Sequence, residues 1–231
     1  MLNNKSFLVI IPARGGSKRL PRKNVLPLAG KPLIAWSIEA SLKSKYIDKV
    51  IVSSDDNEIL EISKNYGSDI IKRPDELASD TASSFDTIVH AIESEEKYDY
   101  VVLIQPTSPL RTEKHINEAI ELLTKKEADA IISVTLAEHS PLWSNVLPQD
   151  NSMKDFLNDT ILNARSQDLD TYYRLNGAIY ICKTEKLLEN KSFFLKENIY
   201  AYIMDNESSV DIDEKMDFKL AELLKMEKQN V

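Results

Sequence analysis

The sequence predicts an α/β fold with a mostly parallel sheet, and two observations support this prediction. Continuous apolar runs end abruptly at turn residues, which is typical of strands buried on both faces. The first run covers residues 7–11 and stops at Pro12. Between such runs lie segments with apolar residues at helical spacing, so strands and helices alternate as far as Thr135. This alternation indicates parallel strands joined by right-handed crossovers.

The individual elements follow from the same patterns. We expect further strands at residues 49–53, 69–71, 100–104, 130–135, 175–182 and 199–204. We expect helices at about residues 32–40, 58–66, 85–92, 112–123 and 185–188, with Pro32 and Thr112 at helix starts and Gly67 at a helix end. A last helix follows Asp213, and its expected inward side carries Met216, Leu220, Leu223 and Leu224.

The chain is long enough for one domain, since it has 231 residues of which 42% are hydrophobic. Between about Glu138 and Arg174 the regular pattern lapses into Pro, Asn, Asp and Ser with scattered apolar residues. So long a span is unusual for a loop in a compact domain. We interpret it as an arm, a small subdomain or a lid.

The charge of the chain is unevenly distributed. The net charge is −8, yet residues 1–38 hold seven cations and no acid, so +7 there leaves −15 for residues 39–231. An acidic protein that gathers cations around one loop is suited to a compact anion, not to coating nucleic acid. We therefore expect no nucleic-acid partner.

The segment after the first strand is interpreted as a phosphate-binding loop. It contains Gly15 and Gly16 and five cations that no acid interrupts, namely Arg14, Lys18, Arg19, Arg22 and Lys23. Exposed backbone N–H groups and cations at the carboxyl end of a strand suit a polyphosphate. The G-x-x-x-x-G-K-[ST] and G-x-G-x-x-G fingerprints are both missing from the sequence. The alternative is a solvated basic loop.

Two carboxylates at alternate positions, Asp211 and Asp213, are candidates for a Mg²⁺ site. Alternate residues of an extended segment face the same way, so both can converge on one cation. Mg²⁺ prefers oxygen ligands together with substrate phosphates, which a phosphate loop in the same chain would bring. The alternative is that Asp213 caps the last helix and Asp211 is a solvated acid.

Cys182 is the only cysteine, so an internal disulfide is excluded. It lies in an apolar run and is expected to be a core residue, not a nucleophile. The sequence shows no N-terminal signal pattern and no long apolar segment. We therefore expect a soluble, cytoplasmic protein without a membrane partner.

Five segments together resemble the CMP-N-acylneuraminate synthetases, the cytidylyltransferases that activate sialic acids. In order they are I-P-A-R-G-G-S-K-R-L-P-R-K-N, R-P-D-E-L-A-S-D-T-A-S-S, Q-P-T-S-P-L-R-T, R-L-N-G-A-I-Y-I and S-V-D-I-D, and the resemblance runs from about Phe7 to Leu224. The related CMP-Kdo synthetases share the style of the first segment and resemble the others less. The resemblance implies a Rossmann-like α/β domain with a small dimerisation element.

The resemblance also implies a reaction, the transfer of CMP from CTP to the anomeric hydroxyl of a nine-carbon 2-keto sugar acid with release of pyrophosphate. By position in the motifs, the implied nucleotide side has Arg14 and Lys18 on the triphosphate, Lys23 and Asn24 around the reacting phosphate, and Arg73 and Ser84 at the cytidine end. The implied sugar-acid pocket contains Gln105, Arg165, Arg174 and Tyr180, with one or both arginines on the substrate carboxylate.

The metal and the catalytic groups are implied in the same way. Asp211 and Asp213 would hold Mg²⁺, for which Mn²⁺ could substitute, and Asp211 could instead assist deprotonation of the attacking hydroxyl. The residues expected to act on the reaction itself are Arg14, Lys18, Lys23 and Asp211. In such transfers the protein mainly aligns the reactants and neutralises developing charge.

The dimerisation element implied by the resemblance fits residues 138–174, with residues 190–198 as a second candidate. Phe193 and Phe194 are adjacent, so in an extended segment they point to opposite faces, and a monomer would struggle to bury both. The resemblance implies that this segment reaches the sugar pocket of a neighbouring subunit in a homodimer. The alternative is that one or both pack inside their own subunit.

The exact sugar acid stays open. Some relatives place a basic side chain near the position of Trp143, and an indole there suits a less polar sugar such as legionaminic acid, or merely packs the arm. Three other hypotheses stay open: CMP-Kdo synthesis, a sugar-1-phosphate nucleotidyltransferase, and a catalytically silent nucleotide-binding or scaffold protein. The intact Arg14, Lys18, Asp211 and Asp213 argue against the last.

Overall fold

The computed structural model describes residues 4–77, 83–165 and 168–229 and centres on one large sheet. The sheet has seven strands in the order β5-β4-β1-β6-β8-β7-β9. In that order they are Asp69–Lys72, Lys49–Ser54, Phe7–Pro12, Tyr100–Leu103, Tyr173–Lys183, Ala130–Leu136 and Ile199–Met204. Only β8 runs antiparallel to its neighbours, β6 and β7. The predicted mostly parallel sheet is confirmed.

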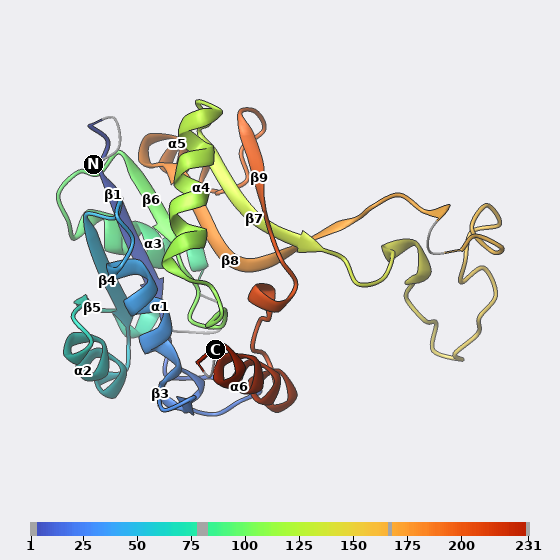
Figure 1. Ribbon diagram of the computed structural model, residues 1–231, viewed down its shortest axis with the longest axis horizontal. Helices are drawn as coiled ribbons and strands as arrows, with labels where there is room; N and C mark the ends of the chain where they lie inside the picture. Colours follow the sequence, from blue (N-terminus) through green and yellow to red (C-terminus); the bar gives the residue numbers. More distant parts are fainter. Residues whose placement is uncertain (1–3, 78–82, 166–167, 230–231) are drawn as a thin grey trace.

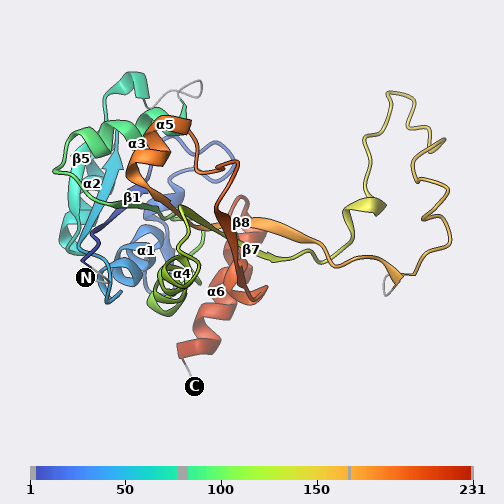
Figure 2. The same cartoon turned by 90° about the horizontal axis from the view of Figure 1, so that it is seen from above.

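Helices cover both faces of the sheet (Figures 1 and 2). They are α1 (Leu33–Leu42), α2 (Asn57–Asn65), α3 (Ser84–Glu93), α4 (Glu113–Lys125), α5 (Thr184–Asn190) and α6 (Lys215–Gln229). Short 3-10 turns lie at Lys23–Val25, Asp75–Leu77, Pro141–Trp143 and Glu207–Ser209, and a small hairpin pairs β2 (Pro27–Leu28) with β3 (Lys31–Pro32). All predicted strands and helices are present in the described residues, with ends shifted by a few residues.

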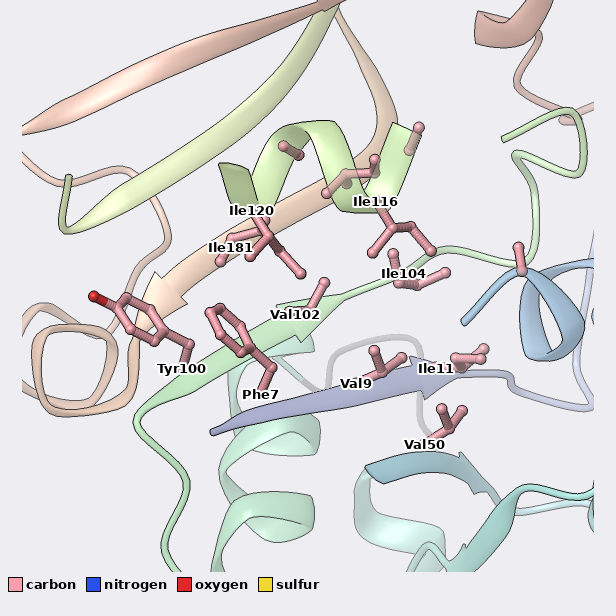
Figure 3. Close-up of a cluster of buried hydrophobic side chains, with 14 of the residues drawn as sticks. Phe7, Val9, Ile11, Val50, Tyr100, Val102, Ile104, Ile116, Ile120 and Ile181 are labelled. Carbon is pink, nitrogen blue, oxygen red and sulfur yellow. The ribbon is translucent and has the colours of Figure 1, made fainter. Parts of the chain in front are cut away.

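Alternation along β1 divides the core into two layers. Phe7, Val9 and Ile11 face a cluster that contains residues of α1 and α4 (Figure 3), whereas Leu8 and Ile10 face a cluster that contains residues of α3 and α5. These five side chains are at most 1% exposed. Burial on both faces explains why the strand is apolar without interruption.

The register of the parallel strands brings three loops to one edge of the sheet. Pro12 of β1 lies opposite Ser53 of β4, and Ile10 lies opposite Leu103 of β6. The segments that follow these strands therefore leave the sheet side by side. Ligands of open α/β sheets bind at such an edge, at the carboxyl ends of the strands.

Residues 137–165 and 168–172 project away from this body as an extended arm between β7 and β8 (Figures 1 and 2). The hydrogen bonds within the described part of the arm are mostly local, such as Asn151 N–H to the Pro148 carbonyl oxygen at 3.0 Å. Several of its apolar side chains are exposed, led by Val146 at 88% and Met153 at 62%.

The expected inward side of the last helix is wrong. Met216, Leu220 and Leu223 of α6 are 72%, 47% and 56% exposed, and Leu224 is half-buried. The helix instead packs through Phe218 and the buried Ala221 onto a cluster that contains Leu28, Leu33 and Ile212. Both sides of α6 carry apolar residues, so periodicity alone could not identify the packed one.

Cys182 is fully buried in β8, which confirms that it belongs to the core. Burial raises the pKa of its thiol to about 12. Within the described part of the chain, the helices are too short or too polar to cross a membrane.

Candidate active site

The basic loop after β1 is fastened to the segment after β4. Ala13 N–H donates to the Ser53 carbonyl oxygen at 3.0 Å, and Gly15 N–H donates to the Asp55 carboxylate at 3.1 Å. A Cβ atom at Gly15 would lie 2.8 Å from the carboxylate of Asp56, so the close approach requires glycine. The loop thus has a fixed course, while the side chains of Arg14 and Lys18 are exposed at its surface.

Two further residues fix the ends of the loop. Asn24 is buried and its side-chain amide donates to the Arg14 carbonyl oxygen at 3.0 Å. Arg22 has a left-handed backbone with a φ of 60°, and its guanidinium pairs with Asp56 and Glu58. Arg22 therefore fastens the loop to α2, although sequence grouped it with the phosphate-binding cations.

Arg73 lies beneath the same edge. It is 5% exposed, and its guanidinium donates to the Ser53 carbonyl oxygen at 2.7 Å. Burial lowers the pKa of the Arg73 guanidinium, the nearby Asp55 opposes this shift, and the nearby Arg14 adds to it. Arg73 and Arg14 therefore share one region of the site. The side chain of Ser84, which the resemblance places at the cytidine end with Arg73, lies outside the described residues.

The segment Asp211–Asp213 meets the basic loop from the other side. Ile212 is fully buried, its N–H donates to the Thr107 carbonyl oxygen at 2.8 Å, and its own carbonyl oxygen accepts from Lys23 Nζ. Both flanking aspartates are exposed. Asp213 lies 2.8 Å from Arg19 Nη1 and 3.8 Å from Lys23 Nζ. Residues almost 200 positions apart therefore meet at one edge.

The electrostatics of this cluster show how closely its charges lie. The surrounding protein raises the pKa of the Asp211 carboxyl, the Thr107 hydroxyl opposes the shift, and the negative charge of Asp213 adds to it. Burial lowers the pKa of Lys23, whereas Asp213 and Asp211 oppose that shift. Two carboxylates that repel each other would be stabilised by a shared cation.

The carboxylate pair fits Mg²⁺ as a ligand set that substrate would complete. Asp211 and Asp213 provide oxygen donors only, which is what Mg²⁺ prefers. Across residues 4–77, 83–165 and 168–229, three or more His, Cys, Asp or Glu side chains do not come together in a metal-binding arrangement. The remaining ligands would therefore be phosphate oxygens and water.

Gln105 and Asp211 meet above a glycine of β8. Gly177 has a φ of +71°, and a Cβ atom there would lie 2.6 Å from Gln105 Oε1 and 3.7 Å from Asp211 Oδ2. Further along β8, burial raises the pKa of Tyr180, and the nearby Asp211 adds to the shift. Gln105, Tyr180 and Asp211 are therefore brought together in one part of the structure.

Asn176 is a supporting residue that sequence reasoning did not single out. It is 1% exposed. Its side-chain Oδ1 accepts from the Ser133 hydroxyl at 2.6 Å, and its side-chain Nδ2 donates to the Ser209 hydroxyl at 2.9 Å. It thereby links β7 and β8 to the segment that leads into Asp211. Its place beside Gly177 in R-L-N-G-A-I-Y-I was the only available signal.

The two adjacent phenylalanines behave differently. Phe193 is 7% exposed and packs on Tyr180, with 5.8 Å between ring centroids. The chain buries this phenylalanine by itself, so the alternative that one of the pair packs inside its own subunit holds for Phe193. Phe194 is 54% exposed and meets the edge of Tyr180, with 6.3 Å between centroids.

The two arginines assigned to the substrate carboxylate do not join Gln105 within this chain. Arg165 is an exposed residue of the arm, where its backbone N–H donates to Asp168 at 3.3 Å. Arg174 is exposed at the start of β8 and lies 3.6 Å from Glu138. Figure 1 shows that the arm leads away from the body on this side.

Comparison with known proteins places this arrangement in a family. The family model described as Cytidylyltransferase matches residues 8–231. The chain therefore belongs to the cytidylyltransferase family.

Two relatives show the range of named substrates. The N-acylneuraminate cytidylyltransferase of Escherichia coli O18:K1:H7 is 41% identical over 96% of this chain, and this chain spans 52% of its length. The CMP-N,N'-diacetyllegionaminic acid synthase of Legionella pneumophila is 36% identical over 94% of this chain and 95% of its own length. The chain thus spans about half of the first relative and almost all of the second.

A solved structure shows the same fold. The CMP:2-keto-3-deoxy-manno-octonic acid synthetase complexed with CTP superimposes with a TM-score of 0.72 and 19% identity, covering 98% of this chain and 100% of that one. The likeness establishes a Rossmann-like nucleotidyltransferase fold.

Proposed function

We propose that this chain transfers CMP from CTP to the anomeric hydroxyl of a nine-carbon 2-keto sugar acid and releases pyrophosphate. The observation that carries the proposal is the meeting of the basic loop with Asp211 and Asp213, where Arg19 and Asp213 lie 2.8 Å apart. Family membership and the names of the two relatives supply the substrates. N-acetylneuraminate is the first candidate acceptor.

The nucleotide side of the site would act by alignment and charge. Arg14 and Lys18 are exposed on a loop whose backbone is held by Asn24, and we assign their cations to the triphosphate. Lys23 lies between the loop and Asp213 and would meet the phosphoryl group under attack. Fixed cations stabilise charge that develops on the leaving pyrophosphate without reorganising during the reaction.

Mg²⁺ is the proposed cofactor, held by Asp211 and Asp213, with Mn²⁺ as a substitute. When bound, the cation would neutralise phosphate charge next to the carboxylates. Asp211 also faces Gln105 across Gly177, so it stands between the metal site and the proposed sugar side. Its raised pKa also suits acceptance of the proton of the attacking hydroxyl.

The proposed working unit is a homodimer in which arms are exchanged. Arg165 stands on an arm that leaves its own body, and apolar side chains of that arm such as Val146 and Met153 are exposed. Exposed apolar surface of this kind marks association sites. A second copy would cover the arm and receive Arg165 next to its own Gln105. We propose the cytoplasm as the location, where CTP is present.

A legionaminic acid is the second candidate acceptor. The legionaminic relative matches this chain over almost its whole length, and Trp143 places a half-buried indole on the arm. CMP-Kdo synthesis is the third candidate, for which the likeness of folds is the only support.

The direct test is pyrophosphate release from CTP with a panel of N-acetylneuraminate, N,N'-diacetyllegionaminate, Kdo and a sugar 1-phosphate. We expect turnover with one or both nine-carbon acids and very little with the other two. UTP should be a poor substitute for CTP, because a site built to pair with the cytosine amine leaves groups unpaired with uracil. Equal rates with UTP, or turnover of the sugar 1-phosphate, would contradict the proposal.

A further inference from the structure

Arg111 is a charged residue in an unusual place. It is 1% exposed, and it is among the largest fully buried side chains of the described residues. It has no ion pair with a carboxylate in the described part of the chain, and burial lowers the pKa of its guanidinium to about 9. A buried, unpaired cation destabilises a core, and apolar residues of similar size usually serve packing better. Its presence therefore needs a reason other than packing.

The guanidinium joins three elements through neutral acceptors. Its Nη1 donates to the carbonyl oxygens of Gln105 and Ala178, at 3.2 and 3.1 Å. Its Nη2 donates to the hydroxyl of Ser37 on α1 at 2.7 Å, and that hydroxyl lies 3.3 Å from the same Gln105 oxygen. Its Nε has no hydrogen-bond partner in the described structure. Arg111 is thus a brace between the segment after β6 and the middle of β8.

Both braced carbonyl groups lie directly behind the proposed sugar side. Gln105 carries the side chain that faces Asp211, and Ala178 follows Gly177, above which those two side chains meet. A Cβ atom at Gly177 would be 2.6 Å from Gln105 Oε1, so the Gln105 side chain lies close against the backbone of Gly177. A small shift of either backbone would therefore change the position of Gln105 Oε1 relative to β8. Burial lowers the pKa values of the nearby His115 and Lys225, and the positive charge of Arg111 adds to both shifts. Neither of these two side chains carries a negative charge that could neutralise the guanidinium.

We propose that Arg111 is a positioning residue for the sugar acid, holding Gln105 and the Gly177 segment at the spacing that binds the acceptor. The proposal rests on the function proposed above. The planar guanidinium places Nη1 on both carbonyl oxygens and Nη2 on the Ser37 hydroxyl at the same time, an arrangement that a lysine ammonium does not match. The unpaired charge also favours an anionic acceptor on this side over a neutral one.

The test compares Arg111→Met with Arg111→Lys by steady-state kinetics with CTP and N-acetylneuraminate. We expect Arg111→Met to raise the KM for the sugar acid about 10- to 100-fold, as small misplacements at a site do. The KM for CTP should stay within about twofold, because Arg111 contacts Gln105, Ala178 and Ser37, none of which belongs to the basic loop. Arg111→Lys should recover part of the loss. A Ser37→Ala variant, which removes one contact of the guanidinium, should give a smaller rise of the same kind.

Leu123→Ala is the matched control for a merely structural role. Leu123 is a buried residue of α4, so its truncation destabilises the core without touching the brace. At a similar drop in melting temperature, Leu123→Ala should leave the KM for the sugar acid unchanged. The proposal is overturned if Arg111→Met changes neither KM, if it raises both together, or if Leu123→Ala reproduces its effect.

Hydrogen exchange separates this proposal from the proposed function. Amides of residues 105–111 and 176–180 should exchange faster in Arg111→Met than in Leu123→Ala, and unchanged exchange would overturn the brace. Failure of the wild-type chain to use any sugar acid of the panel would instead overturn the proposed function. Ser37→Ala and Arg111→Lys provide the same readouts if Arg111→Met does not fold.

Discussion

The edge of the sheet that carries the basic loop and the arm between β7 and β8 differ in how many contacts they make with distant parts of the chain. At the edge, the basic loop, the segment after β4 and the segment Asp211–Asp213 hold one another through contacts between distant residues, such as Lys23 with Ile212. In the described part of the arm the hydrogen bonds are mostly local, such as the Asn145 amide to the Phe156 carbonyl oxygen at 3.1 Å, and apolar side chains face solvent. The edge is preorganised within one chain, whereas the arm is suited to completing a site elsewhere.

The largest effect should come from the metal, which belongs to the edge. Removal of divalent cations with EDTA should abolish turnover, and Mg²⁺ or Mn²⁺ should restore it, because the carboxylates and the phosphates would otherwise repel each other. Asp213→Asn should likewise abolish turnover while circular dichroism shows an intact fold. Full activity in metal-free buffer would show that the edge works without a cation.

Lys18→Ala should have the next largest effect. Removing one preorganised group from the place where charge develops typically lowers the rate on the order of 10²–10³-fold, so we expect that loss in kcat. The KM for CTP should change much less. Lys45→Ala, which removes an exposed cation away from the edge, is the control and should keep full activity. A raised KM for CTP with an unchanged kcat would show that Lys18 binds the substrate and the transition state equally.

Arg165→Ala tests the arm, and this substitution should change the KM for the sugar acid. Loss of a charge-assisted contact with the sugar carboxylate corresponds to about 1.5–3 kcal/mol, or roughly a 10- to 100-fold rise in the KM for the sugar acid. The KM for CTP should be unaffected. Lys154→Ala removes another exposed cation of the arm and should have no effect. Equal behaviour of the two variants would remove Arg165 from the site.

Cys182 should show the smallest effect. Because its thiol is fully buried and burial raises its pKa to about 12, the thiolate population at pH 8 is negligible. Ellman's reagent should leave the folded protein unlabelled and label the unfolded protein once. Cys182→Ala should retain full kcat. Rapid labelling of the folded protein together with loss of activity would give the thiol a functional role.

The same contrast explains what sequence could predict. Strands such as β1 were predictable because apolar runs bounded by turn residues have few other structures, and parallel register then gathers the loops that follow them. The meeting of Asp211 with the basic loop was predictable in the same way. The basic loop follows β1, and Asp211 lies in the segment between β9 and α6. These predictions depend on patterns within short segments.

The rest depends on packing between distant segments. Phe193 and Phe194 are identical in type, and only the position of Tyr180 determines that the first is buried and the second exposed. The burial of Arg111 is invisible in its sequence, since a cation next to a polar loop is normally exposed. The positions of Arg165 and Arg174 depend on the course of the arm, whose contacts in the described structure are mostly local.

The most direct test of the exchanged-arm account is complementation between two defective chains. Lys18→Ala and Arg165→Ala chains are dissociated together, allowed to reassociate, and assayed with CTP and the preferred sugar acid. A mixed dimer has one site with an intact Lys18 and an intact Arg165 from the other chain, so random mixing should restore roughly a quarter of wild-type activity. The assay uses a sugar-acid concentration well below the raised KM of Arg165→Ala, so each variant reassociated alone should show at most about a tenth of the wild-type rate. If the mixture remains at the level of the parents although mass spectrometry shows mixed dimers, Arg165 does not act across the dimer, and the arm serves its own chain or none.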